Sequence, residues 1–204
     1  ELKFTKIKIK GLKPSKSGYL ENYLFKYTRQ QYTFYIAKHK NFLFLGTANG
    51  KIYYAEINKL DSNNFKILHH NLEVDKISFR EMIIDDGNIY VTVVFKKEEK
   101  CNVLKIYKSK IAFNKKLNFK NFFSNSECVS IMAGGRMQAW MKDNEKKILL
   151  STSADILTND DEDDSKPQDD NSIYGKILLI DENSGNYEIF SKGHRNPLGL
   201  YANI

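Results

Sequence analysis

The segment best equipped for chemistry is residues 193–200, which read Gly-His-Arg-Asn-Pro-Leu-Gly-Leu. It places a guanidinium and an amide side by side, at Arg195 and Asn196. Cationic and amide donors of this kind stabilise negative charge that develops on oxygen atoms during a reaction. Arg195 and Asn196 could therefore stabilise such a charge. The alternative for Arg195 is a structural arginine that pairs with a carboxylate.

Three further histidines, His39, His69 and His70, are weaker candidates. Imidazole titrates near neutral pH, so a histidine can serve as a proton acceptor. His39 lies between two lysines in an expected turn, and His69 and His70 lie in an expected connecting loop. We expect all three to be solvated surface residues without a catalytic role.

Acidic residues crowd into residues 159–172, where seven of them stand against one lysine, Lys166. Clustered carboxylates suit Ca²⁺, which takes six to eight oxygen ligands. The spacing lacks both the glycine and the closing glutamate of an EF-hand loop. We expect a solvated insertion loop, with calcium binding as the alternative.

The two cysteines, Cys101 and Cys128, flank a strand-rich segment. They form either a disulfide or two buried thiols. Neither has a Cys-x-x-Cys partner or a neighbouring histidine cluster, so a metal site is a poor explanation.

The elements that must position these residues are strands. Short apolar, aromatic or β-branched runs recur along the chain, and helical spacing is hard to find. The expected strands are residues 32–37, 41–45, 51–57, 77–84, 89–95, 103–107, 147–151, 176–180 and 187–190. Residues 49–50, 85–88 and 183–186 carry the Asn-Gly and Asp-Gly chemistry of tight hairpin turns. The sequence therefore predicts an all-β fold of antiparallel meanders.

A faint internal repeat makes the fold class more specific. Residues 50–54, Gly-Lys-Ile-Tyr-Tyr, resemble residues 175–179, Gly-Lys-Ile-Leu-Leu, and residues 102–107 take the same role between them. Equivalent positions at Lys51, Val103 and Lys176 give a spacing suited to propeller blades of roughly 40 to 50 residues, with an insertion in the second interval. We predict a β-propeller of four-stranded blades, of which about three are present. A β-sandwich would explain the strands without the repeat.

Three ordered strings now carry a family resemblance. Residues 193–200, after the strand-like Tyr187–Phe190, are similar to the GHRNPQGL segment of the glucose/sorbosone dehydrogenases that use pyrroloquinoline quinone (PQQ). Residues 134–136, Gly-Gly-Arg, resemble a string that opens a propeller strand in this family. Residues 172–178, Ser-Ile-Tyr-Gly-Lys-Ile-Leu, resemble the family's LGKILRI strand. The resemblance covers residues 130–204 and is only a general pattern before them.

The resemblance implies a six-bladed propeller that holds PQQ and calcium at one end of its central channel. It implies that Arg195 and Asn196 contact PQQ. It also implies that His194 has a buried hydrogen-bonding role, and that a sugar loses a proton to a histidine base while hydride passes to the quinone. The calcium ligands of the family would lie beyond Ile204.

Some positions depart from the family's pattern. Met132 occupies the place of the catalytic histidine, and a thioether cannot accept a proton. The acidic residue that would orient the base falls at Ala154 or, with a shift of one position, at Asp155. Leu198 replaces a common glutamine. The catalytic base therefore stays unassigned from the sequence.

Two functions follow as hypotheses. The first is a PQQ-dependent sugar (aldose) dehydrogenase, and the second is a catalytically inactive propeller that binds a carbohydrate or a protein partner. A structural protein without a small-molecule site ranks last, and it would bury Arg195 in an ion pair. The family implies a periplasmic or secreted location, which a disulfide would fit.

Composition and the chain ends set the remaining expectations. The net charge is +7, but the lysines are scattered instead of forming a stripe, so nucleic-acid binding is not expected. No run approaches the roughly 20 apolar residues of a membrane span, and no signal peptide is recognisable. The chain begins at Glu1, and we expect residues 1–204 to be a single propeller domain truncated at both ends.

Overall fold

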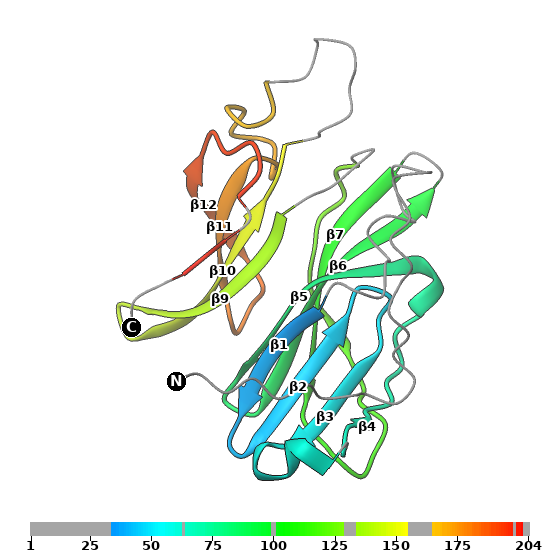
Figure 1. The fold of residues 1–204 in the computed structure, drawn as a ribbon. Helices are drawn as coiled ribbons and strands as arrows, with labels where there is room; N and C mark the ends of the chain where they lie inside the picture. Colours follow the sequence, from blue (N-terminus) through cyan, green and yellow to red (C-terminus); the bar gives the residue numbers. More distant parts are fainter. Residues whose placement is uncertain are drawn as a thin grey trace, which may run out of the picture.

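The computed structural model describes residues 34–62, 64–98, 101–128, 134–154, 165–197 and 199–201. These residues form three four-stranded antiparallel sheets, in which neighbouring strands follow one another along the chain. Figure 1 shows the three sheets side by side, with the first strand of each sheet facing the other sheets. The all-β prediction is confirmed, and the arrangement is that of part of a β-propeller.

The first sheet contains four strands, β1 to β4, and a 3-10 helix, η1, lies between the last two. The bounds are β1 (Phe34–His39), β2 (Phe42–Thr47), β3 (Ile52–Glu56), η1 (Ile57–Ser62) and β4 (Lys66–Ile67). A second 3-10 helix, η2 (Val74–Lys76), leads into the next sheet.

The second and third sheets repeat this plan. The second sheet contains β5 (Ile77–Asp85), β6 (Asn88–Glu98), β7 (Cys101–Lys110) and β8 (Lys120–Ser124). The third contains β9 (Gly134–Lys142), β10 (Glu145–Thr152), β11 (Lys176–Asp181) and β12 (Tyr187–Lys192).

The predicted repeat corresponds to the third strand of each sheet. Lys51 immediately precedes β3, Val103 lies in β7, and Lys176 opens β11. The predicted turns also form between strands, with positive φ at Gly50, Gly87 and Gly185. Three strands lie outside the predicted runs: β4 has only two residues, β8 is a short outer strand, and β9 was anticipated only at its opening Gly-Gly-Arg string.

Two apolar cores lie between the sheets. One core joins the first and second sheets and includes Phe44, Ile52, Phe79 and Val91. The other joins the second and third sheets and includes Leu104, Ile148, Leu150 and Leu178. Each sheet therefore stabilises its neighbour by burying one of that neighbour's faces, as blades of a propeller do.

Polar contacts reinforce the packing of the second sheet against the third. Tyr90 of β6 donates a hydrogen bond to Oε1 of Glu182 at 2.6 Å, and Lys108 of β7 binds the same carboxylate. Lys146 of β10 lies 2.7 Å from Oδ2 of Asp85 at the end of β5. These contacts cross between sheets that follow one another in sequence.

A disulfide joins Cys101, at the start of β7, to Cys128 in the segment after β8. Glu127, the residue before Cys128, accepts hydrogen bonds from the hydroxyl of Ser172 at 2.8 Å and from the backbone N–H of Ile173 at 3.2 Å. The disulfide therefore lies next to the contact that ties the second sheet to the segment leading into β11.

Candidate functional site

The innermost strands β1, β5 and β9 begin at the same end of the molecule and lie against one another there. The Tyr35 hydroxyl donates to the carbonyl of Phe79 at 2.7 Å, and Nε of Arg80 donates to the carbonyl of Gly134 at 3.3 Å. These bonds bring side chains from three sheets together. We call Tyr35, Arg80, Glu81 and Arg136 the inner-strand cluster.

Arg136 is the centre of this cluster. Its Nη1 lies 3.2 Å from Oε2 of Glu81 and 3.0 Å from the carbonyl oxygen of Arg80. Its guanidinium carbon lies 5.5 Å from the ring centre of Tyr35, a distance at which a cation is attracted to an aromatic face. Arg136 therefore links all three sheets.

Local irregularities in the strands bring these groups together. Arg80 is the extra residue of a bulge in β5, because Phe79 pairs with Val93 while Glu81 pairs with Thr92. A bulge re-aims the side chains around it, as bulges near functional sites often do. The neighbouring carbonyl of Arg80 and carboxylate of Glu81 both reach Arg136 from this bend.

Glycine in the Gly-Gly-Arg string permits a close approach between β9 and β5. Gly135 has a φ of +82°, and a Cβ atom added there would lie 2.8 Å from the Cβ of Arg80. Any other residue would strain the backbone and push the two inner strands apart. The string therefore serves to seat Arg136 against the second sheet.

Burial shifts the pKa values of two groups in the cluster. Burial raises the pKa of the Glu81 carboxyl above its ordinary value, although the backbone N–H of Met82 and the charge of Arg136 act in the opposite direction. Burial also lowers the pKa of Arg80. Arginine stays charged even so, because its ordinary pKa is very high. The cluster thus combines two cations with a carboxylate that binds protons more readily than usual.

The segment predicted to contact a ligand is anchored to the third sheet. The backbone N–H of Ala154 donates to the carbonyl of Arg195 at 2.9 Å, and the N–H of His194 donates to the carbonyl of Gly175 at 2.9 Å. The side chains of Arg195 and Asn196 are both exposed. Among the described residues, no carboxylate lies within ion-pair distance of Arg195.

Ser151 of β10 connects the Gly-Gly-Arg string to the segment that contains Arg195. Its hydroxyl accepts a hydrogen bond from the backbone N–H of Arg136 at 3.1 Å and donates one to the carbonyl of Pro197 at 3.2 Å. The strings around Arg136 and Arg195 are therefore held at the same end of the third sheet. The arrangement offers exposed guanidinium and amide donors near a cluster with a further carboxylate and two cations.

The other predicted site residues have mixed outcomes. Met132 and Asp155 lie outside the described residues, and Ala154 is buried. His194 makes a hydrogen bond, as predicted, between its Nε2 and the hydroxyl of Ser191 at 2.8 Å, but its side chain is only half-buried. The assignment of Arg195 and Asn196 to a cofactor stays a prediction.

The prediction that His70 is a solvated surface residue was wrong. This histidine is half-buried, its Nε2 lies 2.7 Å from the carbonyl oxygen of Gly50, and its ring packs edge-on against Phe119. Burial lowers the pKa of its imidazole. His70 is therefore a structural residue of the first two sheets, because the chain folds back over it at Leu117. His69 is exposed, as predicted.

The acidic segment is described only in its second half. There Asp170 pairs with Lys192 at 2.8 Å, and the buried ammonium of Lys176 donates to the carbonyls of Lys166, Pro167 and Tyr174. Among the residues that the structure describes, no three acidic, histidine or cysteine side chains gather as metal ligands would. A lysine thus anchors this half of the insertion.

Sequence reasoning missed Tyr35, Arg80 and Glu81. A usable signal existed for two of them, because Arg80 and Glu81 interrupt an otherwise apolar run in the predicted strand 77–84. Charged residues inside such a run need partners when the strand is buried. The partner, Arg136, is supplied by another sheet and was not foreseeable from spacing.

Comparison with known proteins supports the fold. No family model and no curated protein matches the sequence. Among solved structures, the soluble aldose sugar dehydrogenase of Escherichia coli superposes with a TM-score of 0.58 at 12% identity, covering 80% of this chain and 51% of that chain. A glucose dehydrogenase gives a TM-score of 0.59 at 11% identity, covering 80% of this chain and 56% of its own.

A third similar structure is a putative oxidoreductase (glucose dehydrogenase) of Thermus thermophilus. Its TM-score is 0.57 at 13% identity, and the match covers 79% of this chain and 51% of that one. The chain therefore has a propeller fold like that of these dehydrogenases and spans about half of their length. At these identities the similarity concerns the fold.

Proposed function

We propose that the chain is part of a propeller dehydrogenase that oxidises a sugar with PQQ. The observation that carries the proposal is the bridge at Ser151, which holds the Arg195-Asn196 pair at the same end of the third sheet as Arg136. This end presents donors from two sequence strings that resemble one dehydrogenase family. The similarity in fold to sugar dehydrogenases supports the same class of activity.

The donor chemistry of this end fits PQQ, which carries carboxylates and quinone oxygens. Arg195 and Asn196 have exposed side chains that would hold such an anion, and Arg80 and Arg136 add positive charge nearby. When bound, PQQ supplies the redox chemistry by accepting a hydride. The calcium expected from the family has no candidate ligand cluster among the described side chains.

Glu81 is our candidate for the group that takes the proton from the sugar hydroxyl. Its raised pKa moves it toward the range in which a carboxylate acts as a general base. Arg136 would orient the carboxylate through the 3.2 Å contact and stabilise its ionised form. This assignment replaces the base that Met132 cannot provide.

The alternative is a propeller that has lost catalysis and binds a carbohydrate or a protein partner. One observation favours it: Arg136 is engaged by both Glu81 and the Arg80 carbonyl, as an ion pair between blades would be. In that case the inner-strand cluster only stabilises the fold, and Arg195 and Asn196 bind a partner without catalysing a reaction.

The proposed location is periplasmic or secreted. The Cys101–Cys128 disulfide supports it, since disulfides persist mainly in oxidising compartments. No helix among the described residues is long and apolar enough to span a membrane.

Calorimetry tests the proposal. PQQ is titrated in the presence of calcium into the protein, into Arg195→Ala, and into Lys51→Ala, which removes an exposed cation from the turn before β3. Saturable binding that Arg195→Ala abolishes and Lys51→Ala retains supports the proposed site. Absent binding by the folded protein argues against it and favours the binding module.

A turnover measurement then separates the two functions. The PQQ-loaded protein is assayed with D-glucose and an electron-accepting dye, alongside Glu81→Gln. Dye reduction that falls about a hundredfold in Glu81→Gln, while PQQ affinity is kept, identifies Glu81 as the base. Equal rates in both proteins would remove Glu81 from this role.

A further inference from the structure

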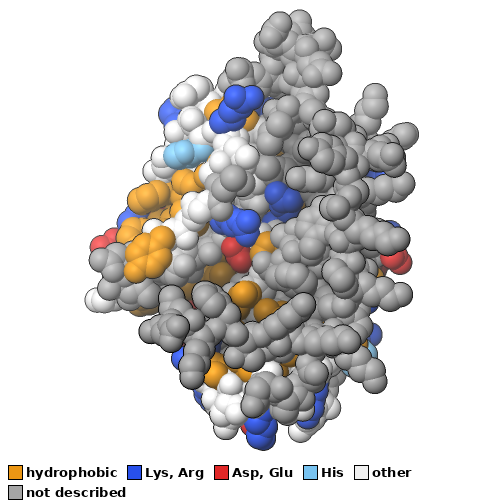
Figure 2. Space-filling model, viewed as in Figure 1, with side chains coloured by type: hydrophobic (Ala, Val, Ile, Leu, Met, Phe, Trp, Pro, Cys, Tyr) orange, Lys and Arg blue, Asp and Glu red, His pale blue; other side chains and the backbone are white. Residues whose placement is uncertain are grey.

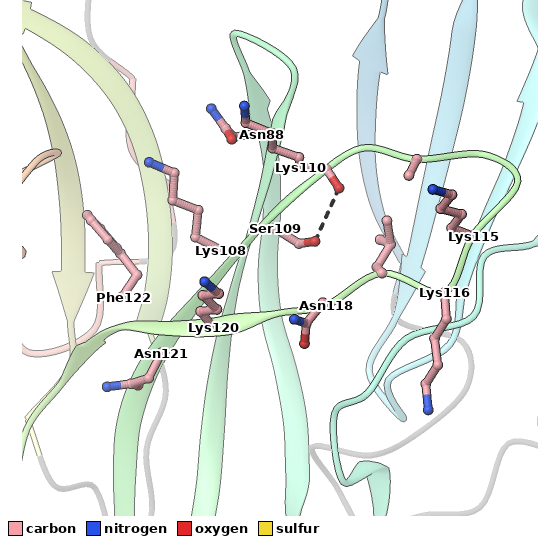
Figure 3. A pocket seen from close by; sticks show the side chains of 12 residues that line it. Asn88, Lys108, Ser109, Lys110, Lys115, Lys116, Asn118, Lys120, Asn121 and Phe122 are labelled. Carbon is pink, nitrogen blue, oxygen red and sulfur yellow. Dashed lines mark hydrogen bonds between the residues drawn. The ribbon is translucent and has the colours of Figure 1, made fainter.

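A lysine-rich hollow lies along β7 and β8, the outer strands of the second sheet, and the loop between them. Its volume is about 620 Å³, within the range of sites for small molecules. Figure 3 shows the lysines around it, with Lys108, Lys110 and Lys120 on strands and Lys115 and Lys116 on the connecting loop. We call this set the lysine pocket.

The strands fix the positions of three of these lysines. Lys108 and Lys110 stand two residues apart in β7, so they share one side of the strand. Lys120 opens β8 and is the direct register partner of Lys108. The antiparallel pairing therefore concentrates three positive charges at one end of two strands.

The loop carrying the other two lysines is held at both ends. The N–H of Ile111 donates to the carbonyl of Gly87 at 3.0 Å, and the N–H of Leu117 donates to the carbonyl of His69 at 2.8 Å. The Leu117 side chain is buried. Lys115 and Lys116 are thus presented from an anchored loop, and they also line an adjoining hollow of about 580 Å³.

The charge of the pocket is largely uncompensated. Lys108 is paired with Glu182, but none of Lys110, Lys115, Lys116 and Lys120 lies within ion-pair distance of a described carboxylate. These four side chains belong to exposed residues. Placing like charges close together costs free energy because they repel one another. A multiply charged anion would remove much of this repulsion by neutralising several lysines at once.

Neutral donors complete the lining. Asn88, Asn118 and Asn121 are also among the residues that line the hollow. Amides bind hydroxyl groups as both donors and acceptors. The ligand that fits both kinds of lining carries several anionic groups on a polyhydroxylated body.

From these observations we infer that the lysine pocket binds a phosphorylated or sulfated sugar. Nucleic acid fits less well, because single strands stack their bases on accessible aromatic rings. The one aromatic ring in the lining, Phe122, packs against Tyr90 with ring centres 5.6 Å apart. The inference concerns a surface separate from the proposed PQQ site and stands without it.

Titration with myo-inositol hexakisphosphate, a compact multiply charged probe, tests the inference. We expect saturable binding to the whole chain that weakens at high salt, and no binding of uncharged myo-inositol. The double variant Lys115→Gln/Lys116→Gln should bind about tenfold more weakly, since it removes two charges from the pocket. The double variant Lys110→Gln/Lys120→Gln, which removes two charges from the strands, should weaken binding to a similar extent.

The matched control is Lys51→Gln/Lys97→Gln, which removes the same charge from exposed positions outside the lining. Equal weakening in the control and the pocket variants would show only general attraction to a positive protein and would overturn the inference. Equal affinity for a DNA duplex of matched charge would overturn it as well.

A competition experiment identifies the source of the sugar ester. Vesicles that display phosphatidylinositol bisphosphate are added to the protein with and without soluble hexakisphosphate. If the protein binds the vesicles, the soluble probe displaces it from them, and the pocket variants no longer bind them, the ligand is a lipid headgroup. Binding of the soluble probe alone indicates a free or polymer-borne sugar ester, and binding of neither overturns the inference.

Discussion

Arg136 and Glu81 form an ion pair of 3.2 Å between the innermost strands of two neighbouring sheets. Both side chains are largely buried, with exposed fractions of 30% and 20%. Removing one partner therefore leaves the other in a poorly solvated position.

We expect a double-mutant cycle with Glu81→Gln and Arg136→Met to give a coupling free energy of about 1 to 2 kcal/mol in urea unfolding. The control is the exposed pair of Glu56 and Lys59, 2.7 Å apart, for which we expect less than about 0.5 kcal/mol. Equal coupling in the two pairs would mean that burial does not strengthen the inner contact.

Alanine substitutions at Gly135 and Gly87 test how closely β5 and β9 approach each other. Both have positive φ, +82° and +72°, so alanine costs about 1 kcal/mol at either position through backbone strain. An added Cβ at Gly135 would lie 2.8 Å from Cβ of Arg80, whereas one at Gly87 would meet nothing within 4 Å. Gly135→Ala should therefore destabilise the protein by about 2 kcal/mol more than Gly87→Ala. Equal unfolding midpoints would refute the close approach.

Glu182 should make the contact between the second and third sheets sensitive to acid. Burial acts to raise the pKa of this carboxyl, but hydrogen bonds from Lys108 and Tyr90 outweigh it and leave the pKa below the ordinary value of 4.5. Its contribution to stability is therefore complete above pH 4.5 and is lost as the pH falls through the lowered, folded-state pKa.

The test is Glu182→Gln, measured by urea unfolding across this pH range. We expect a loss of about 2 kcal/mol at pH 7, because a charged hydrogen-bond acceptor with two donors is removed. The difference from the parent protein should shrink as the pH falls below 4.5. A difference that stays constant with pH would contradict the assignment.

The disulfide between Cys101 and Cys128 closes a separation of 27 residues. Chain-entropy arguments give a contribution of about 3 to 4 kcal/mol for a loop of this length. Cys101→Ser/Cys128→Ser should unfold at correspondingly lower urea concentration, and reductant should lower the stability of the parent protein but not of the variant. Insensitivity of the parent to reductant would count against the bridge.

The exposed apolar side chains of the third sheet and the segment after it include Met141, Tyr187, Phe190 and Tyr201. Figure 2 shows hydrophobic side chains gathered on this side of the molecule.

Much of the fold followed from the sequence because its signals are local. The turn at Asn49–Gly50 requires a positive φ, and the runs such as residues 89–95 carry strand-forming side chains wherever they occur. The repeat at Lys51, Val103 and Lys176 predicted that three similar units exist, since each unit carries its own pattern. These features depend on neighbours along the chain.

The site and the lysine pocket were decided by tertiary structure. Glu81 and Arg136 are 55 residues apart and meet only because β5 bulges and β9 has glycine where the strands touch. The lysines look scattered in sequence, yet strand register and one anchored loop gather five of them. His70 likewise becomes half-buried through contacts with residues distant in the sequence. Sequence spacing cannot predict such contacts, because they depend on how separate sheets pack against one another.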